Sequence, residues 1–321
     1  MSLKYAVIGT GACGGLIGGR LFASGCNVHF LARSDYEQIH EHGIEISGHT
    51  LVKCKLNRVP VYKSIEAMPK CDVILLTTKT YDNAEILPQL KSILTANSII
   101  IILQNGLGLE KEIARFYPEI RQMITVSRIK VSKLSSGSYK HEFGDLIYAM
   151  SYCGREDVYS CAPSSLEAMV VEGFVNAGLK LQFDKDFFQR QWTKLIVNIP
   201  YFILTIKYDV SSDQIYRHHY EELNLLRAEI RQIAGVCSIA IDDEFIEDID
   251  QQLGKAERPT YPSMKIDYDY GRKLEVESIF LPIIGMARAE AIAIPRVMAG
   301  YELLTRPSAE ASRIPTRRSK L

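Results

Sequence analysis

A glycine-rich turn near the amino terminus constrains the fold more than any other feature of the chain. Gly9, Gly11 and Gly14 follow a short apolar run at residues 4–8 and precede a stretch of small and apolar residues at 12–24. In a strand–turn–helix unit, the first glycine permits a tight turn, and the second lets the main chain approach a pyrophosphate. The third allows the helix to pack closely on the strand. The helix then presents the N–H groups of its first turn to the anion.

This spacing predicts a dinucleotide-binding turn. The predicted cofactor-binding segment comprises Gly9, Thr10, Gly11, Ala12, Cys13 and Gly14. A tight turn that only packs a helix on a strand is the alternative. The apolar segments on both sides of the turn favour the dinucleotide site, because the motif has its meaning only between a strand and a helix.

Apolar runs continue to alternate with helical patterns through the first half of the chain. Strands are predicted at residues 27–31, 72–78 and 98–103, and helices at 35–42, 83–96 and 164–177. This alternation predicts right-handed βαβ units and a parallel, doubly wound sheet. Between residues 126 and 152 the pattern alternates and is broken by Ser and Gly, which predicts antiparallel strands that complete the first domain.

Beyond residue 185 the pattern is helical almost to the end, and the clearest helices are predicted at residues 223–240 and 274–291. The predicted fold class is therefore α/β, with an N-terminal Rossmann-like doubly wound sheet followed by an all-helical C-terminal domain. The expected boundaries are a cofactor domain at 1–185, a helical substrate and catalytic domain at 186–305, and a polar tail at 306–321.

The amino-acid composition limits the kinds of binding partner that we expect for this chain. The 38 basic residues equal the 38 acidic ones, so no bulk field attracts nucleic acid or an anionic membrane. No run approaches the roughly 20 apolar residues that span a bilayer, and the amino terminus leads into a strand without the pattern of a signal peptide. The seven cysteines lack a Cys-x-x-Cys pair, which predicts reduced thiols, no metal site and a cytoplasmic location. The terminal Ser319-Lys320-Leu321 matches a peroxisomal address, although three residues match easily by chance.

The end of the second predicted strand indicates which cofactor binds. An NAD site usually places Asp or Glu there to accept a hydrogen bond from the ribose 2′-OH. This chain has Arg33 followed by Ser34, and a guanidinium suits a 2′-phosphate. NADPH (or NADP+) is therefore the predicted cofactor. Asp35 lies close by in the sequence, so NAD is an alternative cofactor. For Arg33, the alternative is an arginine that only contacts solvent at the surface.

Two polar residues follow the next predicted strands. Lys79 comes after the strand at 72–78, and Asn105 comes after the strand at 98–103. Open α/β sheets bind ligands at the carboxyl ends of their strands, so Lys79 is a candidate for a phosphate or a substrate carboxylate. An ordinary strand-end lysine and an Asn-Gly turn are the alternatives.

Lys194 and Asn198 interrupt an otherwise apolar stretch. They are four residues apart, so they share one face of a helix. A polar pair among Leu, Ile and Val is costly unless it meets polar groups, and a carbonyl substrate would satisfy both side chains. An ammonium there can stabilise the negative charge that develops on a ketone oxygen and supply its proton. A lysine whose stem is buried and whose head reaches water is the alternative.

Together these residues resemble the ketopantoate reductase family of NADP-dependent 2-oxo acid reductases, over the chain to about residue 305. The matching elements are the glycine loop at 9–14, Arg33, Lys79, Asn105-Gly106, Lys-Leu-x-x-Asn at 194–198, Ser-Met-x-x-Asp at 263–267, and Glu275.

The resemblance implies that Lys194 is the general acid and that Glu275 orients either this lysine or the nicotinamide ribose. It also implies that Asn105, Asn198 and Ser263 hold substrate or cofactor. A carboxylate near the lysine would keep it charged, which agrees with these roles. From the residues alone, Glu275 also fits a solvated glutamate at a helix start, and Ser263 fits an N-cap.

The chain departs from the family pattern around the substrate. Phe202 stands where the family usually has a second asparagine, and Ser212 lies near the position of another. Phe280-Leu281-Pro282 stands where the family often has Asn-Gly. Fewer amides make the pocket less polar, so the resemblance supports the reaction class more strongly than ketopantoate itself.

The resulting prediction is an NADPH-dependent reduction of a 2-oxo acid to a 2-hydroxy acid. The substrate is ketopantoate, which gives pantoate for pantothenate biosynthesis, or a related acid. The alternative is a non-catalytic NADP(H)-binding sensor of the same fold, which would not need Lys194, Ser263 or Glu275. Another Rossmann enzyme, such as a methyltransferase, leaves Arg33 and Lys194 unexplained. A homodimer is one option for the oligomeric state, because the helical half is apolar.

Overall fold

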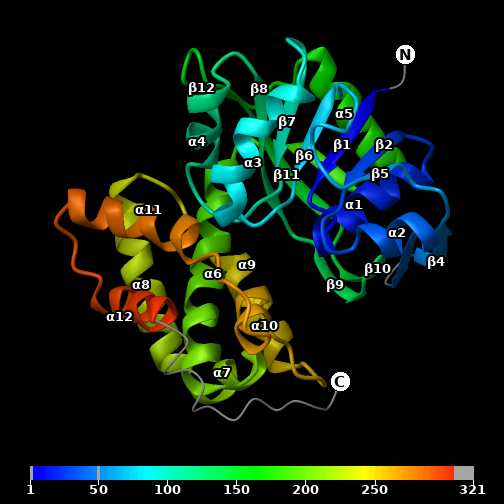
Figure 1. Ribbon diagram of the computed structural model, residues 1–321. Helices are drawn as coiled ribbons and strands as arrows, with labels where there is room; N and C mark the ends of the chain where they lie inside the picture. The colour runs from blue at the N-terminus through cyan, green and yellow to red at the C-terminus, as the bar shows by residue number, and fades with distance from the viewer. Residues whose placement is uncertain (1–2, 49–50, 307–321) are drawn as a thin grey trace. The chain divides into compact units, whose positions relative to one another are not determined.

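A computed structural model describes residues 3–48 and 51–306 of the chain. The chain divides into two compact units between Phe187 and Phe188, called here the first unit and the helical unit. Each unit is described by itself (Figure 1). The terminal Ser319-Lys320-Leu321 lies outside the described residues.

In the described residues, the first unit contains a nine-stranded sheet in the order β12-β11-β8-β7-β6-β1-β2-β5, with β13 paired to β11. The strands are β1 (Lys4–Ile8), β2 (Asn27–Leu31), β5 (Val61–Tyr62), β6 (Val73–Leu76), β7 (Ile99–Ile102), β8 (Arg121–Ser127), β11 (Leu146–Cys153), β12 (Val158–Ser160) and β13 (Lys180–Phe183). The strands from β5 to β8 are parallel, and β11 is antiparallel to β8 and β12. The predicted doubly wound sheet is confirmed.

The chain reverses its direction across the sheet at β1. It first runs outward through β2 to β5, and it then returns to β6 on the other side of β1 before continuing to β7 and β8. The carboxyl ends of β1 and β6 therefore flank a switch point, which is where open α/β sheets bind their ligands. The glycine loop begins at this edge, directly after Ile8.

Helices cover both faces of the sheet. The helices of this unit are α1 (Ala12–Ala23), α2 (Tyr36–His42), α3 (Asn83–Gln89), α4 (Leu109–Phe116) and α5 (Ser165–Asn176), with short 3-10 turns η1 (Thr80–Asp82) and η2 (Leu90–Ser92). Right-handed crossovers on opposite sides of the switch point place α1 on one face and α3 and α4 on the other. As a result β6 and β7 are buried along their whole length.

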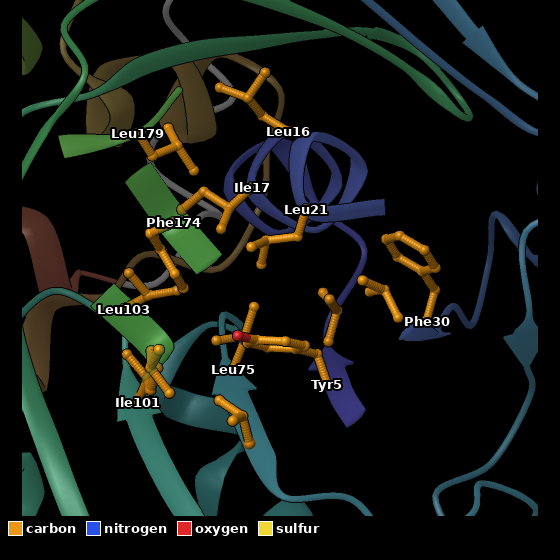
Figure 2. Close-up of a cluster of buried hydrophobic side chains, with 14 of the residues drawn as sticks. Tyr5, Leu16, Ile17, Leu21, Phe30, Leu75, Ile101, Leu103, Phe174 and Leu179 are labelled. Carbon is orange, nitrogen blue, oxygen red and sulfur yellow. The ribbon is translucent and has the colours of Figure 1, made fainter. Parts of the chain in front are cut away.

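One apolar cluster joins α1, α5 and the sheet. Figure 2 shows Ile17 and Leu21 of α1 gathered with Tyr5 of β1, Leu75 of β6 and Phe174 of α5. Each of these side chains is almost fully buried. Burying a side chain of this size contributes about 1.5–3 kcal/mol, so the cluster fixes α1 firmly against the strand that precedes it.

A second, smaller sheet covers the other side of α1. Its order is β4-β3-β10-β9, formed by β3 (Ile44–Gly48), β4 (Leu51–Leu56), β9 (Lys130–Ser135) and β10 (Ser138–Phe143). The antiparallel pair β9–β10 agrees with the prediction for residues 126–152. The sequence patterns do not predict β3 or β4. Helix α1 contacts all four strands, so it is buried between two sheets.

The helical unit consists, in the described residues, of seven helices. They are α6 (Phe187–Tyr208), α7 (Ser212–His218), α8 (Tyr220–Val236), α9 (Asp243–Gly254), α10 (Ser263–Asp269), α11 (Val276–Ala289) and α12 (Pro295–Thr305). The helices predicted at 223–240 and 274–291 are α8 and α11, with slightly different ends. Within the described part of the chain, no helix is both long enough and apolar enough to cross a membrane.

Buried polar contacts join the helices of this unit. Arg227 of α8 donates to both carboxylate oxygens of Asp250 of α9, at 2.7 and 2.8 Å, and the Tyr201 hydroxyl of α6 donates to the same carboxylate at 3.1 Å. The Glu229 carboxylate accepts from the backbone N–H of Arg296 and Val297, at the start of α12. These contacts satisfy charges that would otherwise be costly to bury.

We expect Gly15→Ala to lower the free energy of unfolding of the protein by about 1–3 kcal/mol, because it overpacks the space between α1 and the second sheet. A Cβ at this position would lie 2.2 Å from the ring of Tyr139, a residue of β10 that is fully buried. Urea denaturation followed by circular dichroism measures the change. The matched control is Gly285→Ala in α11, where a Cβ meets none of the described atoms within 4 Å. This control should stabilise its helix by about 0.5–1 kcal/mol. Equal effects of the two variants would contradict the packing explanation.

Candidate active site

The glycine loop has the close contacts that the motif predicts. Gly9 has a φ of 103°, which side chains disfavour, and a Cβ there would lie 2.7 Å from Thr78. A Cβ on Gly14 would lie 2.2 Å from the carbonyl oxygen of Gly9. A Cβ on Gly11, by contrast, meets none of the described atoms within 4 Å, and Gly11 is exposed. The loop is therefore tightly packed on its inner side and open at Gly11, as a cradle for a pyrophosphate requires.

Neighbouring groups hold the loop in this conformation. The backbone N–H and the hydroxyl of Thr10 donate to the carbonyl of Leu31, at 3.0 and 2.7 Å. The Tyr139 hydroxyl donates to the Thr10 carbonyl at 2.8 Å, and the Thr77 hydroxyl donates to the Gly9 carbonyl at 2.7 Å. Burial raises the pKa of Tyr139, so this hydroxyl stays a protonated donor. The carbonyls of the loop are thus turned toward protein donors.

The start of α1 suits an anion. Its first turn, Ala12-Cys13-Gly14, carries no acidic side chain, and Ala12 and Cys13 are only partly buried. The N–H groups of a first helical turn carry a partial positive charge, which favours a phosphate at this point. The residues present therefore fit the dinucleotide that the sequence predicts.

Arg33 lies two residues beyond β2 and is paired. Its Nη2 donates to Oδ2 of Asp82 in η1 at 2.7 Å, while its side chain remains 56% exposed. Asp35, the nearby acidic residue that would suit NAD as the cofactor, is 7% exposed. Its carboxylate accepts from Nζ of Lys133 and from the Ser136 hydroxyl at 2.8 Å. Asp35 thus ties the end of β2 to the second sheet.

Lys79 and Asn105 occur at the carboxyl ends of neighbouring strands, β6 and β7. Both side chains are partly buried. Directly before Asn105, buried Gln104 donates through Nε2 to the Thr78 carbonyl at 2.9 Å and to Oδ1 of Asn83 at 2.8 Å. This amide network fixes the two segments that carry Lys79 and Asn105. The sequence patterns do not single out Gln104 or Asn83, although a glutamine that ends a buried strand is a usable signal.

Lys194 and Asn198 both lie on α6, which is 22 residues long. They are partly exposed, whereas Leu195, Ile196 and Ile199 beside them are buried at 5% exposure or less. Residues four apart share a helical face, so the ammonium and the amide are neighbours within a mostly apolar segment of α6. The predicted spacing on a helix is therefore present.

Glu275 is buried, which differs from the solvated helix-start alternative. It stands at the N-cap of α11, and only 8% of the residue is exposed. The burial of a carboxylate requires a favourable polar environment, so this position is not an ordinary surface cap.

Ser263 is the first residue of α10 and is exposed; the N-cap of this helix is Pro262. The N-cap alternative for Ser263 is therefore wrong. Buried Lys265 anchors α10 through ion pairs with Asp269 and with Asp209 at 2.6 Å, just beyond the end of α6. Within the helical unit, this anchor ties the helix that begins at Ser263 to the helix that carries Lys194.

Of the residues that depart from the family pattern, the two that replace asparagines are both buried. Phe202 is 3% exposed and lies on α6, four residues beyond Asn198. Ser212 is 5% exposed, and its backbone N–H donates to the Thr260 carbonyl at 2.8 Å. Ser212 thus fastens the segment that precedes α10 to the start of α7.

Metal ligands do not cluster in the described residues: no group of three or more His, Cys, Asp or Glu side chains there could hold a metal ion. The adjacent His218 and His219, at the end of α7 and just after it, are not part of any such group among the described residues.

Comparisons with known proteins cover both units. The family model for Ketopantoate reductase PanE/ApbA matches residues 5–152, and the model for its C-terminal part matches residues 186–307. The 2-dehydropantoate 2-reductase of Nostoc sp. is 31% identical over 312 residues, which cover 94% of each chain.

Solved structures share the fold. The crystal structure of 2-dehydropantoate 2-reductase from Geobacter metallireducens superposes with a TM-score of 0.83 and 26% identity, over 94% of this chain and 99% of that one. A D-mandelate dehydrogenase solved with NADH and anilino(oxo)acetate has a TM-score of 0.80 and 22% identity, over 94% of this chain and 97% of that one. At that identity, the second similarity shows the fold alone.

We expect Tyr139→Phe to lower the free energy of unfolding by about 1–3 kcal/mol, because the Thr10 carbonyl loses the hydroxyl that donates to it in a buried place. The ring that fills the space beside Gly15 is retained, so the variant isolates the hydrogen bond. Urea denaturation measures the change, and Tyr270→Phe at a residue whose exposure is 64% is the control, expected within about 0.5 kcal/mol of the parent. No difference between the two variants would contradict a structural role for this hydroxyl.

Proposed function

The chain belongs to the ketopantoate reductase family and is an oxidoreductase of that type, and from this premise we propose that it reduces a 2-oxo acid to a 2-hydroxy acid with NADPH. The match of the family models to both units supports the proposal. The observation that most favours catalysis is the Lys194–Asn198 pair on α6, which keeps partial exposure among buried apolar neighbours.

The first unit would hold the cofactor. The glycine loop from Gly9 to Gly14 would bind the pyrophosphate through the backbone and the start of α1. Arg33 would receive the 2′-phosphate, and Lys79 and Asn105 would bind cofactor or substrate groups at the carboxyl ends of β6 and β7. When it is bound, the reduced nicotinamide supplies the hydride.

Lys194 would act on the substrate oxygen. Its ammonium would stabilise the negative charge that develops on the carbonyl oxygen and would give that oxygen a proton from Nζ. Asn198, on the same helical face, would donate a hydrogen bond to the substrate. Ser263, exposed at the start of α10, would bind the substrate carboxylate. The buried Glu275 carboxylate would orient either the ammonium or the nicotinamide ribose and favour the charged form of the lysine.

We propose two candidate substrates, ketopantoate and a less polar 2-oxo acid. Phe202 and Ser212 replace amides of the family pattern, and both are buried. Buried amides that hydrogen-bond a hydroxyl discriminate strongly for that hydroxyl. Their replacement favours a 2-oxo acid with an apolar side chain at least as much as ketopantoate.

The remaining predictions concern assembly and location. A homodimer stays a prediction, favoured by exposed apolar side chains of the helical unit that include Leu225, Val236 and Leu281. Light scattering coupled to size-exclusion chromatography would test it. A cytoplasmic location, and a small-molecule substrate rather than a nucleic acid or membrane partner, also stay predictions.

We expect Lys194→Ala to reduce kcat by about 10²-fold or more, because the carbonyl oxygen loses its proton donor. Loss of NADPH absorbance with a panel of 2-oxo acids measures the rate, with ketopantoate and apolar analogues included. The matched control is Lys207→Ala on the same helix, a lysine that pairs with Glu222 at 2.6 Å. This control should keep the parental rate.

Two results would contradict the proposal. If the parent binds NADPH yet oxidises it with no 2-oxo acid of the panel, the non-catalytic sensor becomes the better explanation. If the parent turns over and Lys194→Ala keeps its rate, the chain is a reductase, but the ammonium at position 194 is not its acid.

A further inference from the structure

We propose that Asp82 is a specificity-determining residue for the cofactor, because its carboxylate competes with the ribose 2′-phosphate for Arg33. The inference rests on the proposed function, since it assumes that the first unit binds a dinucleotide. It concerns which of the two dinucleotides this chain prefers, and by how much.

The ion pair lies across the carboxyl end of β1. Arg33 follows β2, and Asp82 ends η1 after β6, and these two strands are the neighbours of β1 on either side. Nη2 of Arg33 lies 2.7 Å from Oδ2 of Asp82. The pair therefore joins the two strand ends that flank the glycine loop. The adenosine ribose of a dinucleotide is expected at this edge of the sheet, at the end of the second strand.

Asp35 cannot fill this role equally well. Its carboxylate accepts from Lys133 of β9 and from Ser136 in the turn after β9, and the residue is buried. Asp82 keeps 23% of its side chain exposed and contacts the guanidinium directly. Of these two acidic residues, Asp82 is the one whose charge acts on Arg33.

The competition follows from charge. A 2′-phosphate carries roughly −1.5 to −2 charges near neutral pH, and it would bind the same guanidinium that the carboxylate already holds through Nη2. To bind, the phosphate must displace the carboxylate or stay next to a like charge, and either outcome weakens NADPH binding. NADH has a neutral 2′-hydroxyl, which can donate a hydrogen bond to a carboxylate. The Asp82 carboxylate therefore lowers the preference for NADPH over NADH.

Asp82→Asn isolates this charge. The amide keeps an acceptor oxygen for Arg33 and remains a good residue at the N-cap of α3, where Asp82 stands. Surface ion pairs of this exposure contribute little to stability, so the variant is expected to fold as the parent does. A change in dinucleotide affinity then reports on charge competition and not on the fold.

The experiment measures Kd for NADPH and for NADH by isothermal titration calorimetry on the full chain, for the parent, Asp82→Asn and Arg33→Ala. We expect Asp82→Asn to tighten NADPH binding by about three- to tenfold, from like-charge repulsion across several ångströms of partly screened solvent. NADH should bind with the parental Kd or more weakly. Arg33→Ala should weaken NADPH and leave NADH nearly unchanged. The gain of Asp82→Asn should also shrink as salt is raised, because the Debye length falls from about 10 Å at 0.1 M to about 3 Å at 1 M.

The matched control is Glu119→Gln, which removes a carboxylate paired to Arg155 at 2.5 Å. Glu119 precedes β8 and so lies at the opposite, amino-terminal edge of the sheet. The Glu119→Gln variant changes the net charge by the same amount as Asp82→Asn, and both Kd values should equal those of the parent. An equal gain from the control would assign the effect to overall charge and overturn the proposal.

The remaining outcomes separate this inference from the proposed function. If Asp82→Asn leaves NADPH binding unchanged or weakens it, the carboxylate positions Arg33 or is inert, and the inference is wrong while the dinucleotide site stands. If the parent and all variants bind neither dinucleotide, the proposed function itself fails. Adenosine 2′,5′-bisphosphate and 5′-AMP, which differ only in the 2′-phosphate, should reproduce the difference between NADPH and NADH.

Discussion

The first unit depends on the close approach of helix α1 to the turn that precedes it. A side chain at position 14 would collide with the Gly9 carbonyl, at 2.2 Å, and with the Thr77 hydroxyl, at 2.5 Å. Without this contact, the first turn of α1 could not lie over the end of β1, and its N–H groups would not face a bound anion. The same helix is packed between two sheets, so its position constrains both the glycine loop and the placement of the second sheet.

The two units contribute different physical means of recognition. The first unit offers mainly backbone groups, a helix start and a few strand-end side chains, which suit the phosphates and ribose of a cofactor. The helical unit offers an ammonium and an amide on one face of α6, and it also carries a buried carboxylate at the start of α11. Groups fixed on long helices keep their geometry better than groups on loops, and stabilisation of a developing charge requires such fixed geometry.

Much of this organisation follows from local patterns in the sequence. The strands β1, β2, β6 and β7 are predicted because parallel strands buried on both faces are nearly continuous apolar runs. The spacing of Lys194 and Asn198 predicts a shared face because only helical periodicity is needed. The sequence predicts a helix at residues 164–177, and in the structure a capping box between Ser164 and Glu167 begins α5 at this point.

Other features depend on tertiary contacts between distant segments. Strands β3 and β4 mix two lysines and one glutamate with apolar residues, and this pattern is too weak to predict a strand. The burial of Glu275 depends on tertiary packing, so its local sequence context indicates only a surface cap. Gln104 and Asn83 meet across 21 residues, and Arg33 and Asp82 meet across 49. The periodicity of a helix or a strand in the sequence cannot predict contacts between residues this far apart.

The hydroxyl of Tyr139 has a consequence for the order of folding. It binds the Thr10 carbonyl across 129 residues, so the glycine loop leaves the ribosome long before the strand that secures it. Contacts of such separation form late, since the intervening chain must close first. An amino-terminal fragment that ends before β10 would contain every residue of the Gly-x-Gly-x-x-Gly motif and still lack the donor that fixes its main chain. The motif is thus complete in sequence well before it is complete in space, and nascent chains should gain affinity for dinucleotides only after the second sheet has assembled.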